Sequence, residues 1–73
     1  MSNLKNARIA AGLSQSALAQ QSGVNFRMLQ NYEQGVKNID GAKIETLAAL
    51  SRVLGCGISD IMENPETVKN ARI

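Results

Sequence analysis

Residues 12–35 read GLSQSALAQQSGVNFRMLQNYEQG, and they hold the clearest structural pattern in the chain. Its apolar residues recur with a helical period, and glycines stand at both ends and in the middle. Ser14 and Asn25 can act as N-caps, because a side-chain oxygen there accepts a hydrogen bond from an unpaired backbone N–H. An apolar residue precedes each cap and another follows four positions after it, which is the spacing of a hydrophobic staple. The stretch predicts two short helices joined by a turn at Gly23, a helix-turn-helix unit over about residues 14–34.

The sequence on either side also has a helical period, and no segment alternates polar and apolar residues over a strand's length. A first helix is expected over residues 3–11, with Gly12 as its stop. A fifth, short helix is expected to hold Ile58, Ile61 and Met62. We therefore predict an all-α domain of five helices over residues 1–63.

The fourth helix is expected to follow a polar loop at residues 36–41. We predict that Asp40 caps this helix and that it runs to about residue 54. Its apolar residues fall on one face: Ile44, Leu47, Leu50 and Leu54.

Residues 64–73 form a tail. Asn64-Pro65-Glu66 combines an N-cap, a proline at the first helical position and an acid in the first turn. The tail is therefore either a sixth short helix or a frayed end. Residues 69–73 repeat residues 5–9 letter for letter as KNARI. Two readings stay open: coincidence in a helix-favouring tail, or imitation of the first helix against a neighbouring chain.

The composition excludes several kinds of chemistry. The 73 residues suffice for one domain, with no histidine and a single cysteine, Cys56. A disulfide within the chain, a Cys/His zinc site and an imidazole base are excluded, and no metal or cofactor is expected. Without paired acids at a defined spacing or a phosphate-binding glycine loop, we do not expect an enzyme. We interpret Cys56 as a small apolar filler between the fourth and fifth helices.

The charge is small but unevenly distributed. The net charge is +2, yet residues 1–38 hold four basic residues against one acid, while residues 39–73 hold four against five. No apolar run approaches the length of a membrane span, and no N-terminal signal is present, so we expect a cytoplasmic, nucleoid-associated protein with no membrane contact. Nothing points to a small-molecule ligand.

One face of the second helix of the unit suits the reading of bases. If Leu29 faces the core, the helical period puts four hydrogen-bonding side chains on the opposite arc: Arg27, Gln30, Asn31 and Gln34. Arginine pairs with guanine, and asparagine and glutamine pair with adenine, in the DNA major groove. The alternative is a solvated polar face, although such faces usually favour lysine and glutamate.

From Leu4 to Met62 the chain resembles the phage repressor and Cro-type helix-turn-helix regulators, the XRE family. The residues that carry the resemblance are Arg8, Gly12-Leu13-Ser14-Gln15, Leu18-Ala19, Gly23-Val24, Leu29, Tyr32-Glu33, Gly35, Leu47, Leu50 and Leu54-Gly55. The resemblance implies a five-helix, lambda-repressor-like domain and a sequence-specific, repressor-like regulator. It implies double-stranded DNA as the partner and, because members commonly bind as dimers, a homodimer.

The resemblance also implies roles for single residues. Phe26, Arg27 and Asn31 match positions that most often meet bases, and Gln30 lies on the same arc. Arg8 and Glu33 match a structural ion pair. Gln15 and Asn25 match positions that contact the DNA backbone. Phosphate contacts are also expected from Ser14 at the start of the second helix, and from Lys37 and Asn38 in the loop after the third helix, which is longer than in the family pattern.

One residue departs from the family pattern, and one set of apolar residues favours a different function. Phe26 is apolar where members often carry a polar base reader, so it either meets a thymine methyl group or covers the junction of the second and third helices. Apolar residues outside the expected core favour an alternative function, a protein-interaction module such as an antitoxin: Val36, Ile39, Val68 and Ile73.

Overall fold

The computed structural model of the chain describes residues 2–64. Within that range the helices are α1 (Asn3–Ala10), α2 (Gln15–Ser22), α3 (Phe26–Gln34), α4 (Ile44–Leu54) and α5 (Ile58–Ile61), with a 3-10 helix, η1 (Ile39–Gly41), before α4. No strand occurs in the part that is described, which confirms the all-α prediction. The predicted sixth helix, the second KNARI segment, Val68 and Ile73 lie outside the described residues.

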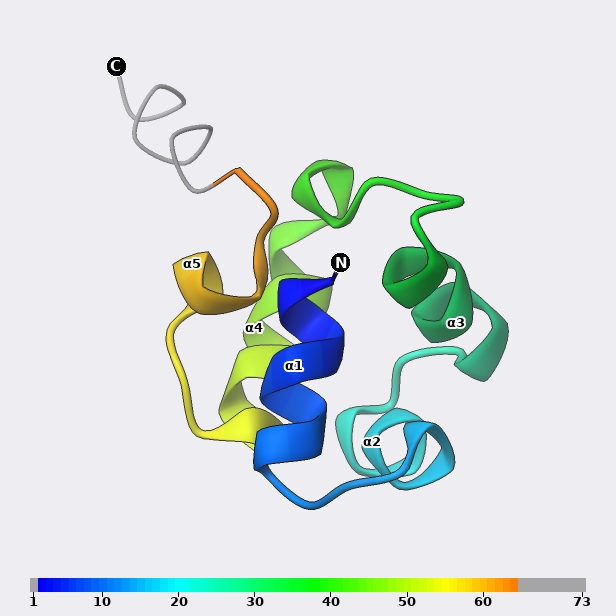
Figure 1. Ribbon diagram of the computed structural model, residues 1–73, viewed down its shortest axis with the longest axis vertical. Helices are drawn as coiled ribbons and strands as arrows, with labels where there is room; N and C mark the ends of the chain where they lie inside the picture. The colour runs from blue at the N-terminus through cyan, green and yellow to red at the C-terminus, as the bar shows by residue number, and fades with distance from the viewer. Residues whose placement is uncertain (1, 65–73) are drawn as a thin grey trace.

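The helices are arranged so that α2 and α3 form one side of the domain. Figure 1 shows them to the right of α1 and α4, with α5 on the left. The helix α4 contacts both α2 and α5, while α1 contacts α5 and α3. The helix-turn-helix unit therefore packs against α4 through α2 and against α1 through α3.

The core receives at least one fully buried side chain from every element. These side chains are Leu4, Leu18, Leu29, Ile39, Leu50, Ile61 and Met62. Burial of this apolar surface is the main force that holds such short helices, which would be marginal alone in water. Tyr32 of α3 is also in the core. Cys56 is partly buried against the same cluster, as expected of a filler.

The residues predicted as N-caps, Ser14 and Asn25, stand at the starts of α2 and α3. Ser14 Oγ accepts a hydrogen bond from the backbone N–H of Ala17 at 3.0 Å. Asn25 Oδ1 accepts from the backbone N–H groups of Arg27 and Met28, at 2.8 and 3.2 Å. Gly23 ends α2 with a φ of 76°, a left-handed conformation that glycine adopts without strain.

The prediction that Asp40 caps the fourth helix is wrong. Residue 40 lies in η1, which Asn38 caps by accepting from the backbone N–H of Asp40 at 2.9 Å. The Asp40 carboxylate instead accepts from the backbone N–H groups of Glu63 and Asn64, at 2.8 and 2.9 Å. Lys43 takes the N-cap position of α4 and makes no side-chain cap hydrogen bond there. The Asp40 side chain thus binds residues distant in sequence, whereas the local sequence pattern had predicted that it caps the fourth helix.

Two assignments of apolar residues are also wrong. Ile44 was predicted on the buried face of the fourth helix, but it is 62% exposed, because it is the first residue of α4 and burial on that helix begins at Leu47. Ile39 was predicted to lie outside the core, but it is only 2% exposed, because η1 turns it inward. Val36 is exposed as predicted. The loss of Ile39 from the surface weakens the case for a protein-interaction module.

Candidate nucleic-acid interface

The outer face of α3 is the centre of the candidate interface. Leu29, Tyr32 and Glu33 are buried on its inner side. On the other side, Arg27 and Gln34 are exposed, and Gln30 and Asn31 are half-buried. Within residues 2–64 the side chains of Arg27, Gln30 and Asn31 make no hydrogen bond or ion pair with the protein. These donors and acceptors are therefore free for an external partner.

The starts of α2 and α3, next to this face, carry exposed polar groups. Ser14 and Asn25 are exposed, and their cap hydrogen bonds use side-chain oxygens as acceptors. The Ser14 hydroxyl hydrogen and the Asn25 side-chain NH₂ stay available as donors. The first backbone N–H groups of α2 and α3 add the positive end of the helix dipole.

A buried ion pair fixes α3 against α1. Arg8 Nε donates to Glu33 Oε2 at 2.7 Å, and Arg8 Nη2 donates to Glu33 Oε1 at 3.0 Å. The two side chains are only 11% and 2% exposed. The hydrogen bond with Glu33 raises the pKa of Arg8 above its ordinary value, against an opposing effect of burial. The pair that the family resemblance implies is thus present, and its arginine is turned away from the outer face.

Gln15 is part of the same network. Its Nε2 donates to Glu33 Oε1 at 3.0 Å, so the first residue of α2 is tied to the carboxylate of α3. An amide NH₂ group carries two hydrogens, and this hydrogen bond uses one. The half-buried Gln15 therefore keeps a donor that is held in a fixed position at the start of α2.

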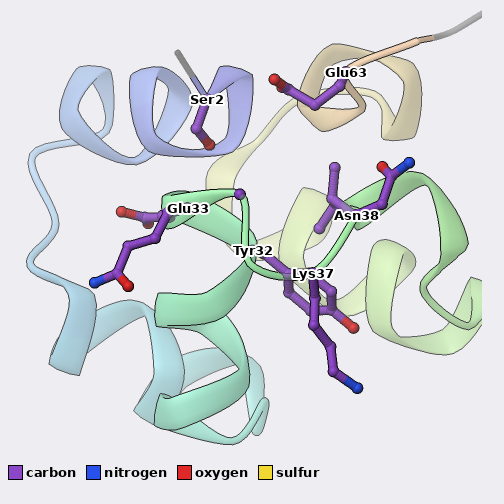
Figure 2. A pocket seen from close by; sticks show the side chains of 9 residues that line it. Ser2, Tyr32, Glu33, Lys37, Asn38 and Glu63 are labelled. Carbon is purple, nitrogen blue, oxygen red and sulfur yellow. The ribbon is translucent and has the colours of Figure 1, made fainter.

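The loop after α3 carries Lys37 and Asn38, both exposed. The backbone N–H of Lys37 donates to the carbonyl of Asn31 at 3.2 Å, which ties the loop to α3. A hollow of about 390 Å³ separates this loop from Ser2 and Glu63. In Figure 2 the Lys37 side chain points away from those two residues. Its charge is thus directed out of the hollow.

Sequence reasoning missed one feature of this region. Met28, 37% exposed, borders a groove between the start of α3 and the first turns of α4, together with Asn25 and Glu45. The groove has a volume of about 260 Å³. A methionine beside a polar arc gives no sequence signal of its own, because the groove exists only once α4 is in place.

The structure thus gathers the predicted site residues around α3. Phe26, Arg27, Gln30 and Asn31 lie on it, and Asn25 caps it. Gln15 is hydrogen-bonded to it through Glu33, and the Lys37 backbone is hydrogen-bonded to its last turn. The described residues contain no cluster of acids and cysteines that could hold a metal ion.

A model of the helix-turn-helix family matches residues 4–61, from α1 to the end of α5. No curated protein and no solved structure matches the chain. None of the helices between residues 2 and 64 has the length and apolar character needed to cross a membrane.

Proposed function

Because the chain belongs to the helix-turn-helix family of Cro/C1-type regulators, which bind DNA, we propose that it is a sequence-specific, repressor-like protein that reads the major groove with α3. One observation carries the proposal. The outer face of α3 presents Arg27, Gln30 and Asn31 without any partner in the described part of the protein. A face of unpaired, forked hydrogen-bonding groups is what base edges require.

Base reading follows from the chemistry of these three side chains. Arg27 can donate two hydrogen bonds to O6 and N7 of guanine, and Asn31 or Gln30 can pair with N6 and N7 of adenine. Each such pair gives about 1–3 kcal/mol of discrimination against the wrong base. Two or three pairs in a half-site are enough to specify a short sequence.

Phosphate contacts would set the register of α3 in the groove. The donors of Ser14, Gln15 and Asn25 lie at the starts of α2 and α3, where backbone N–H groups also attract an anion. Lys37 and Asn38 would hold the backbone from the loop after α3. Contacts of this kind position a protein without reading sequence.

A second subunit would supply the affinity that one domain lacks. The net charge of +2 predicts weak non-specific binding, because that binding depends on the number of phosphates neutralised. We propose a homodimer on two half-sites, with centres about 10 base pairs or a multiple of it apart. Occupancy of such a site would block transcription. The protein-interaction module is not favoured, because the family model that matches the chain supports DNA binding. Of the two described residues that favoured the module, Val36 is exposed and Ile39 is buried.

Salt dependence of binding to duplex DNA tests the proposal. Affinity should fall steeply as salt rises, and Lys37→Ala should reduce the logarithmic slope by about one for each bound subunit. Arg52→Ala removes the same charge from the last turn of α4 and should leave the slope unchanged. Absence of binding to genomic DNA fragments at low salt would contradict the proposal.

A further inference from the structure

Phe26 is exposed and lies outside the hydrophobic core cluster. It is the first residue of α3, and 42% of its surface is accessible. It is absent from the apolar residues that pack against the core, whereas its neighbour Val24 and Leu13 are among them. Of the chain's two aromatic residues, one is buried and this one is presented outward.

The position of Phe26 on α3 places it at the edge of the face with free hydrogen-bonding groups. At about 100° per residue, Phe26 lies nearly in line with Gln30, four residues later, and next to Arg27. Met28 falls on the opposite edge and borders the groove beside α4. The N-terminal residues of a recognition helix contact base edges, and Phe26 is the first residue of this one.

The chemistry of the major groove offers one match for a phenyl ring at this position. Base edges there display donors and acceptors, which a phenyl ring cannot satisfy, and the C5 methyl group of thymine, which it can cover. Resting on the proposed function, we infer that Phe26 reads a thymine methyl group next to the base pair that Arg27 contacts. Contact with the methyl removes apolar surface of both partners from water.

Replacement of thymine by uracil tests this inference, because it removes the methyl group and leaves the base-pairing groups unchanged. The probe is the duplex site that the full-length protein selects from random DNA, with each thymine of a half-site replaced in turn by deoxyuridine. For the native protein, one position per half-site should lose affinity, by about fourfold per methyl group. The Phe26→Ala variant should bind the thymine and uracil duplexes equally.

Two variants serve as controls. Met28→Ala removes the other exposed apolar side chain of α3 and should keep the preference for thymine. Phe26→Leu keeps an apolar contact and should keep part of that preference. Because Phe26 lies outside the core, Phe26→Ala should unfold in urea at nearly the native concentration, which shows that the loss is local.

The outcomes separate this inference from the proposed function. The inference is overturned if no thymine is sensitive, if Phe26→Ala keeps the sensitivity, or if Met28→Ala removes it instead. In each of those cases binding that still depends on Arg27 leaves the proposed function standing. If the protein selects no DNA site, the proposed function fails and the inference fails with it.

Discussion

Gln15 and Glu33 are joined by a hydrogen bond of 3.0 Å between Nε2 and Oε1. This contact connects a residue at the first turn of α2 to a carboxylate that Arg8 already holds from α1. The side-chain amide of Gln15, which we expect to contact a DNA phosphate, is thus positioned by the Glu33 carboxylate. The same carboxylate joins α3 to α1 through Arg8. The stability of the domain and the proposed DNA contact of Gln15 would therefore both depend on the Glu33 carboxylate.

Breaking the ion pair should destabilise the fold. Glu33→Gln leaves the charge of Arg8, whose side chain is 11% exposed, without its partner. We expect the free energy of unfolding to fall by about 3–5 kcal/mol, the usual cost of removing one member of a buried pair. Urea denaturation followed by circular dichroism measures this. Glu45→Gln, which removes an exposed carboxylate from α4, is the control. A loss for Glu33→Gln no larger than that of the control would show that the pair contributes nothing.

Gln15→Ala should weaken DNA binding without changing its sequence preference. Loss of one hydrogen bond to a charged phosphate should cost roughly a tenfold rise in Kd. Gln20→Ala, an exposed glutamine further along α2, should leave the Kd unchanged. Titration of both variants against a preferred and an unrelated duplex separates the two effects. An altered preferred sequence in Gln15→Ala would mean that Gln15 reads a base instead.

The Asp40 side chain should stabilise the segment at Glu63 and Asn64 and not the start of α4. Its carboxylate accepts two backbone N–H groups, from Glu63 and Asn64, so Asp40→Ala should lower the free energy of unfolding by about 1–2 kcal/mol. Amide hydrogen exchange should quicken at Glu63, while the amides in the first turn of α4 keep their rates. Faster amide exchange only in the first turn of α4 would instead indicate that Asp40 caps that helix.

The thiol of Cys56 should ionise at a higher pH in the folded protein than in the unfolded chain. Burial, with a smaller contribution from the charge of Asp60, raises its pKa above the ordinary 9.0. A folded-state pKa above the unfolded one means that the unfolded chain loses the proton first, so stability falls as pH rises through about 9. The rate of alkylation by iodoacetamide can be measured against pH for the folded protein in buffer and for the chain unfolded in about 8 M urea. The pH at which the rate is half-maximal should be higher in buffer. Equal midpoints would contradict this, and Cys56→Ala should show a smaller decline of stability above pH 9.

The sequence predicted best what local hydrogen bonding decides. Ser14 and Asn25 cap helices by reaching amides two or three residues away, so their role is visible in a short window of sequence. The open face of α3 is predictable for the same reason, because the helical period alone assigns Arg27 and Asn31 to it.

Contacts between distant segments were predicted poorly. Asp40 pairs with residues more than 20 positions away, and Ile39 is buried because η1 turns it toward the core, so no local pattern marks either. The ion pair of Arg8 and Glu33 joins residues 25 positions apart. It was expected only through the family resemblance. The spacing of residues in the sequence also gives no indication of the hydrogen bond from Gln15 to Glu33.

Selection of binding sites from random duplex DNA, by the native protein and by Arg27→Ala, tests whether α3 reads the DNA sequence. We expect an inverted repeat with half-site centres about 10 base pairs or a multiple apart. Arg27→Ala should lose the preference at one base pair of each half-site, at a cost of about 1–3 kcal/mol, while Arg52→Ala should select the native site. A site that Arg27→Ala selects unchanged, or the absence of any enriched sequence, would contradict the reading of DNA by α3.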